Sequence, residues 1–310
     1  EYVAEATRWA RAIKMVDPTA RLVSCGELGW TDWDRVVIDG LAPLVDLHSV
    51  HIYTGSDDYW TNVLSPHAAQ RAIDVTAAAL SRAAYAHGLA RPPRIVYDEW
   101  NVWFRDRSGA LEERYVWSDA LAVGAYLNIF VRNCRWVAMA NLAQMVNVIA
   151  PIVTTPATAV TQPIYYPFLL HSHGHLDEAV DAFVDGPTVG PPAAGLSSWA
   201  HRVDDQAPFG LVDAAATVDT GRSRVAVTLV NRSESPERVE LVLRDREFDG
   251  VAQLRVVTAG GPSPAVTGVE TVELDEVQEH PNGGVLVAEL PARSFTLLEA
   301  PVLGGGAASG

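Results

Sequence analysis

With 310 residues, 48% of them hydrophobic, the chain can bury a sizeable core and has room for two domains. Its formal net charge of −15 argues against nucleic acid or an anionic membrane as a partner, because both carry negative charge and no basic run opposes the net field. No apolar run reaches the roughly 18 residues of a membrane span, whereas a neutral partner such as a glycan fits the charge.

Helical and strand patterns alternate through the first half of the chain. Apolar residues recur every three or four positions over 2–16, which predicts an amphipathic helix, and an Ala-rich segment predicts a second helix. The alternation is typical of a parallel sheet with helical crossovers. The expected elements are helices over 2–16, 68–86 and 115–132, strands over 21–24, 45–53, 94–99 and 136–141, and loops over 26–34 and 54–62.

The pattern changes at about Pro163, where we expect helical periodicity to disappear. Short runs with alternating apolar residues follow, separated by Gly, Pro and Asn-Gly clusters. Regularly spaced short strands of this kind indicate an antiparallel β-sandwich. The predicted strands cover 224–230, 238–243, 254–257, 285–290 and 294–298, and residues 303–310 are predicted to form a flexible tail.

Two cysteines, Cys25 and Cys134, lie far apart and have no metal-binding spacing. Neither a disulfide framework nor a zinc site is indicated, and both thiols are expected to be buried. His171-Ser-His-Gly-His175 would place His171, His173 and His175 on one face of a strand, but no acidic ligand accompanies them, so a metal site is not favoured. We expect no metal and no cofactor.

The strand that begins at Arg94 carries the strongest candidate for chemistry. Ile95 and Tyr97 belong to a buried apolar run, and Glu99 lies at its carboxyl end. Because side chains alternate along a strand, all three are expected on one face. A carboxylate that ends such a row among aromatic rings suggests a catalytic group, although an N-cap or a salt-bridged acid would also fit.

The strand over 45–53 brings a second pair of candidates. Its alternation places His51 and Tyr53 on one face, at the end of the strand that would open into a barrel mouth. Tyr53 could instead be an aromatic core residue, and a single inward His such as His51 is as often structural as functional.

Two segments resemble one known family. Asp98-Glu99-Trp100-Asn101-Val102-Trp103 after an apolar strand resembles the nucleophile segment of the family 51 glycoside hydrolases, the α-L-arabinofuranosidases. Gln144-Met-Val-Asn-Val-Ile-Ala-Pro151 is similar to the family's stretch after barrel strand eight. The resemblance covers nearly the whole chain. It implies the C-terminal half of a (β/α)8 TIM barrel over 1–162, with strands five to eight, followed by an antiparallel β-sandwich over 163–302.

The resemblance also implies roles for individual residues. Glu99 would be the nucleophile of a retaining, exo-acting α-L-arabinofuranosidase, and Tyr53 would hydrogen-bond both Glu99 and the sugar. Trp103 would pack against the furanose ring, and the Gln144 amide would bind sugar hydroxyls. His51 would line the floor of the site. The expected substrate is an arabinofuranosyl oligosaccharide from hemicellulose or pectin.

Glycoside hydrolysis also needs an acid/base carboxyl group. The family carries it in an Asn-Glu-Met-Asp-Gly-Pro-Trp-like segment at the end of strand four, and this sequence contains no such segment. We expect it just upstream of Glu1, because the chain starts without Met directly in a helical pattern, and we therefore expect residues 1–310 alone to be inactive. Glu27, at the end of the first strand, is the one substitute to consider, but it matches no family motif.

Several alternatives stay open. Another retaining barrel glycosidase, such as a β-xylosidase or an endoglucanase, would share the nucleophile strand. A non-catalytic sugar-binding protein would explain the missing acid/base segment. A cytoplasmic location is expected, although the absence of a recognisable signal peptide says little about export, and the complete protein could form a homo-oligomer.

Overall fold

The computed structural model describes residues 1–105, 111–191, 203–282 and 284–303, so most of the predicted tail lies outside the described residues. The chain divides into two compact units, each made of several segments. The first unit contains Glu1–Thr54, His67–Asn101 and Asn133–Ala143. The second contains Gly55–Pro66, Val102–Arg132 and Gln144–Gly310.

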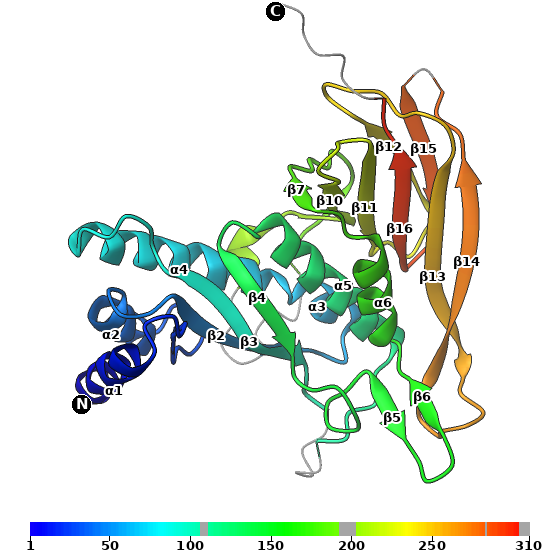
Figure 1. Ribbon diagram of the computed structural model, residues 1–310. Coiled ribbons are helices and arrows are strands. Elements are labelled where there is room, and N and C mark those ends of the chain that lie inside the picture. Colours follow the sequence, from blue (N-terminus) through cyan, green and yellow to red (C-terminus); the bar gives the residue numbers. More distant parts are fainter. Residues whose placement is uncertain (106–110, 192–202, 283, 304–310) are drawn as a thin grey trace, which may run out of the picture. The chain divides into compact units, whose positions relative to one another are not determined.

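A parallel sheet with strand order β1-β2-β3-β4 forms the centre of the first unit (Figure 1). β1 pairs with β2, and β3 with β4, in the parallel sense, and helices α2 and α4 separate successive strands in the chain, as the βα alternation predicts. The elements of this unit are α1 (Tyr2–Val16), β1 (Val23–Ser24), α2 (Asp32–Leu41), β2 (Leu47–Thr54), α4 (His67–Ala86), β3 (Arg94–Val102) and β4 (Val137–Leu142).

Two short helices replace parts of the predicted loops over 26–34 and 54–62. Helix α2 starts at Asp32 because Thr31 and Asp34 form a capping box, in which each side chain bonds the backbone N–H of the other residue. Helix α3 (Tyr59–Leu64), in the second unit, is capped by Asp58, whose carboxylate accepts a hydrogen bond from the Thr61 N–H.

The second unit contains a six-stranded antiparallel sheet with order β14-β13-β16-β11-β10-β7 and a two-stranded sheet of β12 and β15. The prediction of antiparallel strands in this half is confirmed. The strands are β5 (Ile152–Thr154), β6 (Ala159–Thr161), β7 (Glu178–Val180), β8 (Thr188–Val189), β9 (Phe209–Gly210), β10 (Val212–Val218), β11 (Arg224–Asn231), β12 (Glu237–Val242), β13 (Ala252–Pro262), β14 (Glu270–Glu279), β15 (Val285–Leu290) and β16 (Ser294–Pro301).

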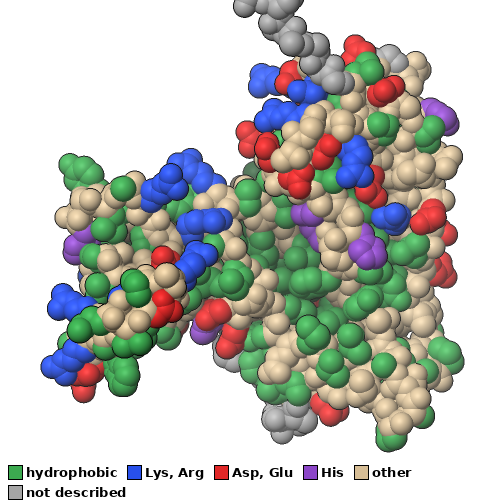
Figure 2. Space-filling model, viewed as in Figure 1, with side chains coloured by type: hydrophobic (Ala, Val, Ile, Leu, Met, Phe, Trp, Pro, Cys, Tyr) green, Lys and Arg blue, Asp and Glu red, His purple; other side chains and the backbone are tan. Residues whose placement is uncertain are grey.

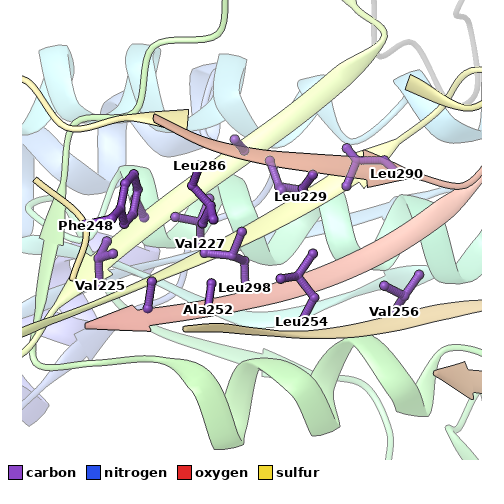
Figure 3. Packing of buried hydrophobic residues seen from close by; sticks show 14 of the residues in the cluster. Val225, Val227, Leu229, Phe248, Ala252, Leu254, Val256, Leu286, Leu290 and Leu298 are labelled. Carbon is purple, nitrogen blue, oxygen red and sulfur yellow. The ribbon is translucent and has the colours of Figure 1, made fainter. Parts of the chain in front are cut away.

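One apolar cluster joins the two antiparallel sheets. Figure 3 shows side chains of β11, β13 and β16 meeting those of β15, as the period-two alternation of these strands requires. On the face of these sheets that Figure 2 shows, basic and acidic side chains are interspersed. The labelled core residues are Val225, Val227, Leu229, Phe248, Ala252, Leu254, Val256, Leu286, Leu290 and Leu298.

Two helices, α5 (Trp117–Arg132) and α6 (Tyr165–Gly174), cover the residues of β16 that alternate with this core. Glycine makes the close packing possible: a Cβ at Gly124 would lie 2.6 Å from the Phe295 ring, and one at Gly174 would lie 2.3 Å from Leu297. Helix α6 contradicts our expectation that helical periodicity ends at Pro163. Its apolar residues surround the helix instead of forming one stripe, so the sequence has no helical period to detect there.

The two cysteines also differ from expectation. Cys25 and Cys134 are both exposed free thiols. Cys25 directly follows β1, and Cys134 lies between the end of α5 and the start of β4, so neither belongs to a core-facing strand or helix. No described helix is long and apolar enough to cross a membrane.

Candidate active site

The carboxyl ends of β2 and β3 bring together two acidic and two aromatic side chains. The Tyr53 hydroxyl donates a hydrogen bond of 2.8 Å to Glu99 Oε2. Beside it, His51 Nε2 lies 2.9 Å from Asp98 Oδ1, an ion-pair contact when the imidazole is protonated. His51 and Tyr53 are alternate residues on β2, so they share a face.

Asp98 and Glu99 are consecutive residues, and on a regular strand their side chains would point to opposite faces. The pairing of β3 with β4 shifts register between Tyr97 and Trp100, which interrupts the alternation at this point. The irregularity lets both carboxylates reach side chains on the same face of β2. A bulge beside a functional group is a common way to redirect a side chain.

The same irregularity corrects the predicted alternation of β3. Tyr97 is fully buried, and its hydroxyl donates to the Ala69 carbonyl of helix α4 at 2.8 Å. Glu99 is instead exposed and accepts from Tyr53. The two residues therefore have different surroundings, although strict alternation predicted one face for both.

Tyr53 is a permanent donor at this site. Burial, together with the hydrogen bond to Glu99, raises the pKa of the Tyr53 hydroxyl above its ordinary value of 10.0. The phenol therefore stays protonated throughout the neutral range. Donation to one carboxylate oxygen fixes the orientation of Glu99.

The charge of His51 depends on Asp98. The Asp98 carboxylate raises the pKa of His51, burial opposes the shift, and Glu99 and Asp34 contribute further attraction. The protonated imidazole is thus favoured beside the two carboxylates. The sequence pattern did not predict Asp98 as a neighbour of His51. The available signal was the spacing: two side chains two residues apart on β2 face two adjacent acids on β3.

Trp103 and Gln144 belong to the second unit. Trp103 follows β3 directly and is half-buried. Gln144 is exposed, lies two residues after β4, and its backbone N–H donates to the Ile149 carbonyl at 3.1 Å. The structure therefore brings Tyr53 to Glu99 within the first unit, and describes Trp103 and Gln144 separately within the second.

The loop after β1 is fixed to β2 beside the site. The Glu27 N–H donates to Asp34 Oδ1 at 2.7 Å, and the Glu27 carbonyl accepts from the His51 N–H at 2.7 Å. The Glu27 side chain is exposed. Its backbone thus supports the strand that carries His51 and Tyr53.

A chain of hydrogen bonds behind this loop has the residue types of a serine hydrolase triad. Ser24 Oγ lies 2.8 Å from His48 Nδ1, and His48 Nε2 lies 3.2 Å from Asp34 Oδ1. The three residues are at most 3% exposed, so no substrate carbonyl reaches the serine. Gly26 is required next to them, because a Cβ there would lie 1.9 Å from the Ser49 carbonyl. The chain of bonds is structural.

The three histidines of the His171 to His175 tract end helix α6 and do not lie on a strand. The His171 and His175 rings are 4.3 Å apart. Burial lowers the pKa of both, and their mutual repulsion further lowers that of His171. Within the part of the chain that the structure describes, no group of three or more His, Cys, Asp or Glu residues could hold a metal ion.

Replacement of Tyr53 by phenylalanine should lower kcat by about 10- to 100-fold with the fold retained. The reason is the loss of one hydrogen bond to a charged group, about 1.5–3 kcal/mol. Tyr85→Phe is the matched control, because Tyr85 is 90% exposed on α4. Kinetics and circular dichroism check this for both variants, each as the chain joined to a segment that supplies the acid/base carboxyl group. Equal kcat for Tyr53→Phe and wild type would remove Tyr53 from the site.

A parallel β/α sheet with an accessible, oriented carboxylate at the carboxyl end of a strand has the features of an α/β enzyme active site. Comparison with known proteins gives the family. The family model of the α-L-arabinofuranosidase C-terminal domain matches residues 98–294. The chain therefore belongs to the α-L-arabinofuranosidase family, and the resemblance of its two motifs to that family is confirmed.

Relatives match along most of the chain. It is 34% identical to α-L-arabinofuranosidase C of Emericella nidulans, covering 96% of this chain and 60% of that protein. It is 30% identical to the intracellular exo-α-(1→5)-L-arabinofuranosidase 1 of Bacillus subtilis, covering 82% of this chain and 52% of that protein. The fold is similar to that of a Thermotoga maritima α-L-arabinofuranosidase solved with arabinose, with a TM-score of 0.80, 23% identity, and coverage of 97% of this chain and 61% of that one. The chain thus spans between 52% and 61% of the length of these relatives.

Proposed function

We propose that this protein is a retaining, exo-acting α-L-arabinofuranosidase and that Glu99 is its nucleophile. The observation that carries the proposal is the 2.8 Å hydrogen bond from Tyr53 to Glu99 at the carboxyl ends of two neighbouring parallel strands. A nucleophilic carboxylate must be accessible and held in one orientation. The exposure of Glu99 gives the access, and the hydrogen bond from Tyr53 holds the orientation.

The proposed reaction has two steps. The Glu99 carboxylate attacks the anomeric carbon of a terminal arabinofuranose while an acid protonates the leaving oxygen, and a covalent glycosyl-enzyme forms. Water then cleaves this ester, with the former acid acting as base, so that the configuration is retained. Tyr53 holds the carboxylate, His51 lines the floor, Trp103 packs on the furanose and the Gln144 amide binds sugar hydroxyls.

The proposed architecture is the C-terminal half of a (β/α)8 barrel over 1–162, with β1 to β4 as barrel strands five to eight, and a β-sandwich over 163–302. The parallel strand order and the shared core of the antiparallel sheets support it. In a β/α barrel, catalytic side chains come from the carboxyl ends of several strands. His51 and Tyr53 lie in the carboxyl-terminal half of β2, and Glu99 lies in that of β3, which continues to Val102.

The acid/base carboxyl group is proposed to come from outside these 310 residues. The sequence has no segment like the family's acid/base motif, and the chain spans about 60% of the length of its relatives. We therefore expect residues 1–310 alone not to release arabinose from substrates with natural leaving groups, because a poor leaving group needs protonation. In the tests below, the catalytically active form is the chain joined to the segment that supplies this group.

The proposed substrate is an arabinofuranosyl oligosaccharide of hemicellulose or pectin. That the protein is cytoplasmic and that its complete form is a homo-oligomer remain predictions.

Chromogenic substrates test the proposed function directly. The catalytically active form should hydrolyse 4-nitrophenyl α-L-arabinofuranoside with a kcat/KM about 100-fold or more above that for the β-D-xylopyranoside, since a polar site shaped for one sugar discriminates strongly against groups that leave its hydrogen bonds unpaired. Preference for the pyranoside or for internal glucan bonds would identify the β-xylosidase or endoglucanase alternative. Binding of arabino-oligosaccharide without turnover would identify a non-catalytic sugar-binding protein.

A further inference from the structure

The segment Gln144–Pro151 holds two backbone conformations that L-residues rarely adopt. Asn147 has φ of 64° and Ile149 has φ of 36°. Asn tolerates the left-handed region because its short side chain can bond locally, whereas a β-branched residue such as Ile is strained there. Strain of this kind persists only where the surroundings enforce it, and it gathers at sites that need a fixed geometry.

Main-chain hydrogen bonds enforce the conformation at three points. The Ile149 N–H donates to the Leu111 carbonyl at 2.6 Å, and the Asn147 N–H donates to the Ile152 carbonyl at 2.8 Å. The Gln144 N–H donates to the Ile149 carbonyl at 3.1 Å. This bond joins Gln144, the first residue of the turn, to the strained residue Ile149. The Ile149 side chain is 4% exposed and anchors the turn from inside.

Asn147 adds a side-chain clamp. Its Oδ1 accepts from the Thr154 N–H at 2.7 Å, and its Nδ2 donates to Thr154 Oγ1 at 2.9 Å. The following carbonyls are also held, since the Gln162 side chain donates to the Ala150 carbonyl at 2.7 Å. Hydrogen bonds therefore hold the turn at several backbone groups, while Gln144 itself is exposed at its start.

We propose that Asn147 and Ile149 are positioning residues for Gln144. This inference rests on the proposed function, in which the Gln144 amide binds sugar hydroxyls. An amide offers one acceptor and two donors, so it can bind adjacent hydroxyls only if its plane is correctly placed. The strained turn fixes the backbone of Gln144 before the sugar arrives, which reduces the ordering cost of binding.

The competing explanation is that the turn only stabilises the fold. The two explanations differ in what happens when the Gln144 amide is absent. A positioning residue loses its effect on sugar recognition once there is no amide to position, whereas a residue that only stabilises the fold acts independently of Gln144. A double-mutant cycle measures this difference.

The experiment compares Gln144→Ala, Asn147→Ala and the double variant in the catalytically active form, with 4-nitrophenyl α-L-arabinofuranoside as the probe. We expect Asn147→Ala to lower kcat/KM by about 10-fold when Gln144 is present and by less than about twofold when it is alanine. Thr158→Ala, in the exposed turn between β5 and β6, is the matched control and should leave kcat/KM unchanged.

Two further variants separate positioning from folding. Asn147→Asp keeps the acceptor for the Thr154 N–H and should recover at least about half of kcat/KM, with a melting temperature that shows the fold is intact. In Ile149→Asn, the new residue tolerates the left-handed region but removes the buried isoleucine side chain. This variant should reduce kcat/KM when Gln144 is present and much less when residue 144 is alanine.

An equal loss from Asn147→Ala in both backgrounds would overturn the inference, as would no loss while Gln144→Ala is impaired. If Gln144→Ala itself has normal kcat/KM, the site assignment in the proposed function fails and the inference fails with it. Failure of the site assignment is distinguishable from failure of the inference alone, because only the former leaves kcat/KM of the single variant Gln144→Ala unchanged.

Discussion

Replacement of Glu99 by alanine is expected to lower kcat for arabinofuranosides by about 10⁴-fold or more in the catalytically active form, a loss similar to that from removal of other enzymic nucleophiles. Alanine removes the carboxylate that would form the glycosyl-enzyme, while neighbouring Tyr53 remains. Because Glu99 is exposed, the substitution leaves no buried cavity, and the melting temperature should change little.

Glu27→Ala is the matched control for this variant. Glu27 is an exposed carboxylate of the same compact unit, and its backbone carbonyl accepts a hydrogen bond from the N–H of His51. Its kcat should stay within about twofold of wild type. Near-normal turnover by Glu99→Ala would refute the nucleophile assignment. A comparable loss in Glu27→Ala would mean that this carboxylate takes part in catalysis.

Replacement of Asp213 by alanine is expected to destabilise the second unit by about 3–5 kcal/mol, because removal of one partner leaves buried charge without compensation. Asp213 Oδ1 lies 3.0 Å from Arg132 Nη2 and 3.7 Å from Arg232 Nη2. Asn128 Nδ2 donates to the other carboxylate oxygen at 2.8 Å. These contacts join helix α5 to strand β10, so their loss should be seen in the midpoint of urea unfolding.

Asp275→Ala, an exposed position on β14, is the control and should change stability by less than about 0.5 kcal/mol. A shift for Asp213→Ala no larger than that of the control would show that the buried ion pairs contribute little net stability.

The same carboxylate should contribute to acid sensitivity. Burial acts to raise the pKa of Asp213, but Arg132 and Arg232 outweigh it, and the pKa is lowered from its ordinary 3.8. A lowered carboxyl pKa stabilises the fold above the unfolded value and loses this contribution as pH falls below about 4. The stability difference between wild type and Asp213→Asn should therefore shrink in that range.

The sequence predicted best the elements whose apolar residues lie on one face. Helix α1 has the predicted bounds of 2–16, and β15 those of 285–290, because each presents a regular apolar face. Strand β14 was missed because it lies at the sheet edge and most of its side chains are exposed, so it has no apolar alternation to detect. Helix α6 was missed for the opposite reason, since it is apolar on all sides.

The site could be predicted in part. The spacing of His51 and Tyr53 and the position of Glu99 are local features, and motif and strand pattern reveal them. The contact between His51 and Asp98 depends on a register shift between β3 and β4, which is a property of strand pairing and not of one segment. Likewise, the left-handed conformation of Ile149 follows from hydrogen bonds to distant residues, and its side chain alone would argue against it.

The most direct test of the central claim is chemical rescue of Glu99→Ala by azide with 4-nitrophenyl α-L-arabinofuranoside, whose good leaving group needs little protonation. If Glu99 is the nucleophile, azide should enter the space left by its carboxylate and attack the same face of the sugar. Rescued turnover should then give the β-configured arabinofuranosyl azide, inverted relative to the substrate, as identified by NMR. No rescue, or an azide product of retained α configuration, would contradict the assignment of Glu99 as nucleophile.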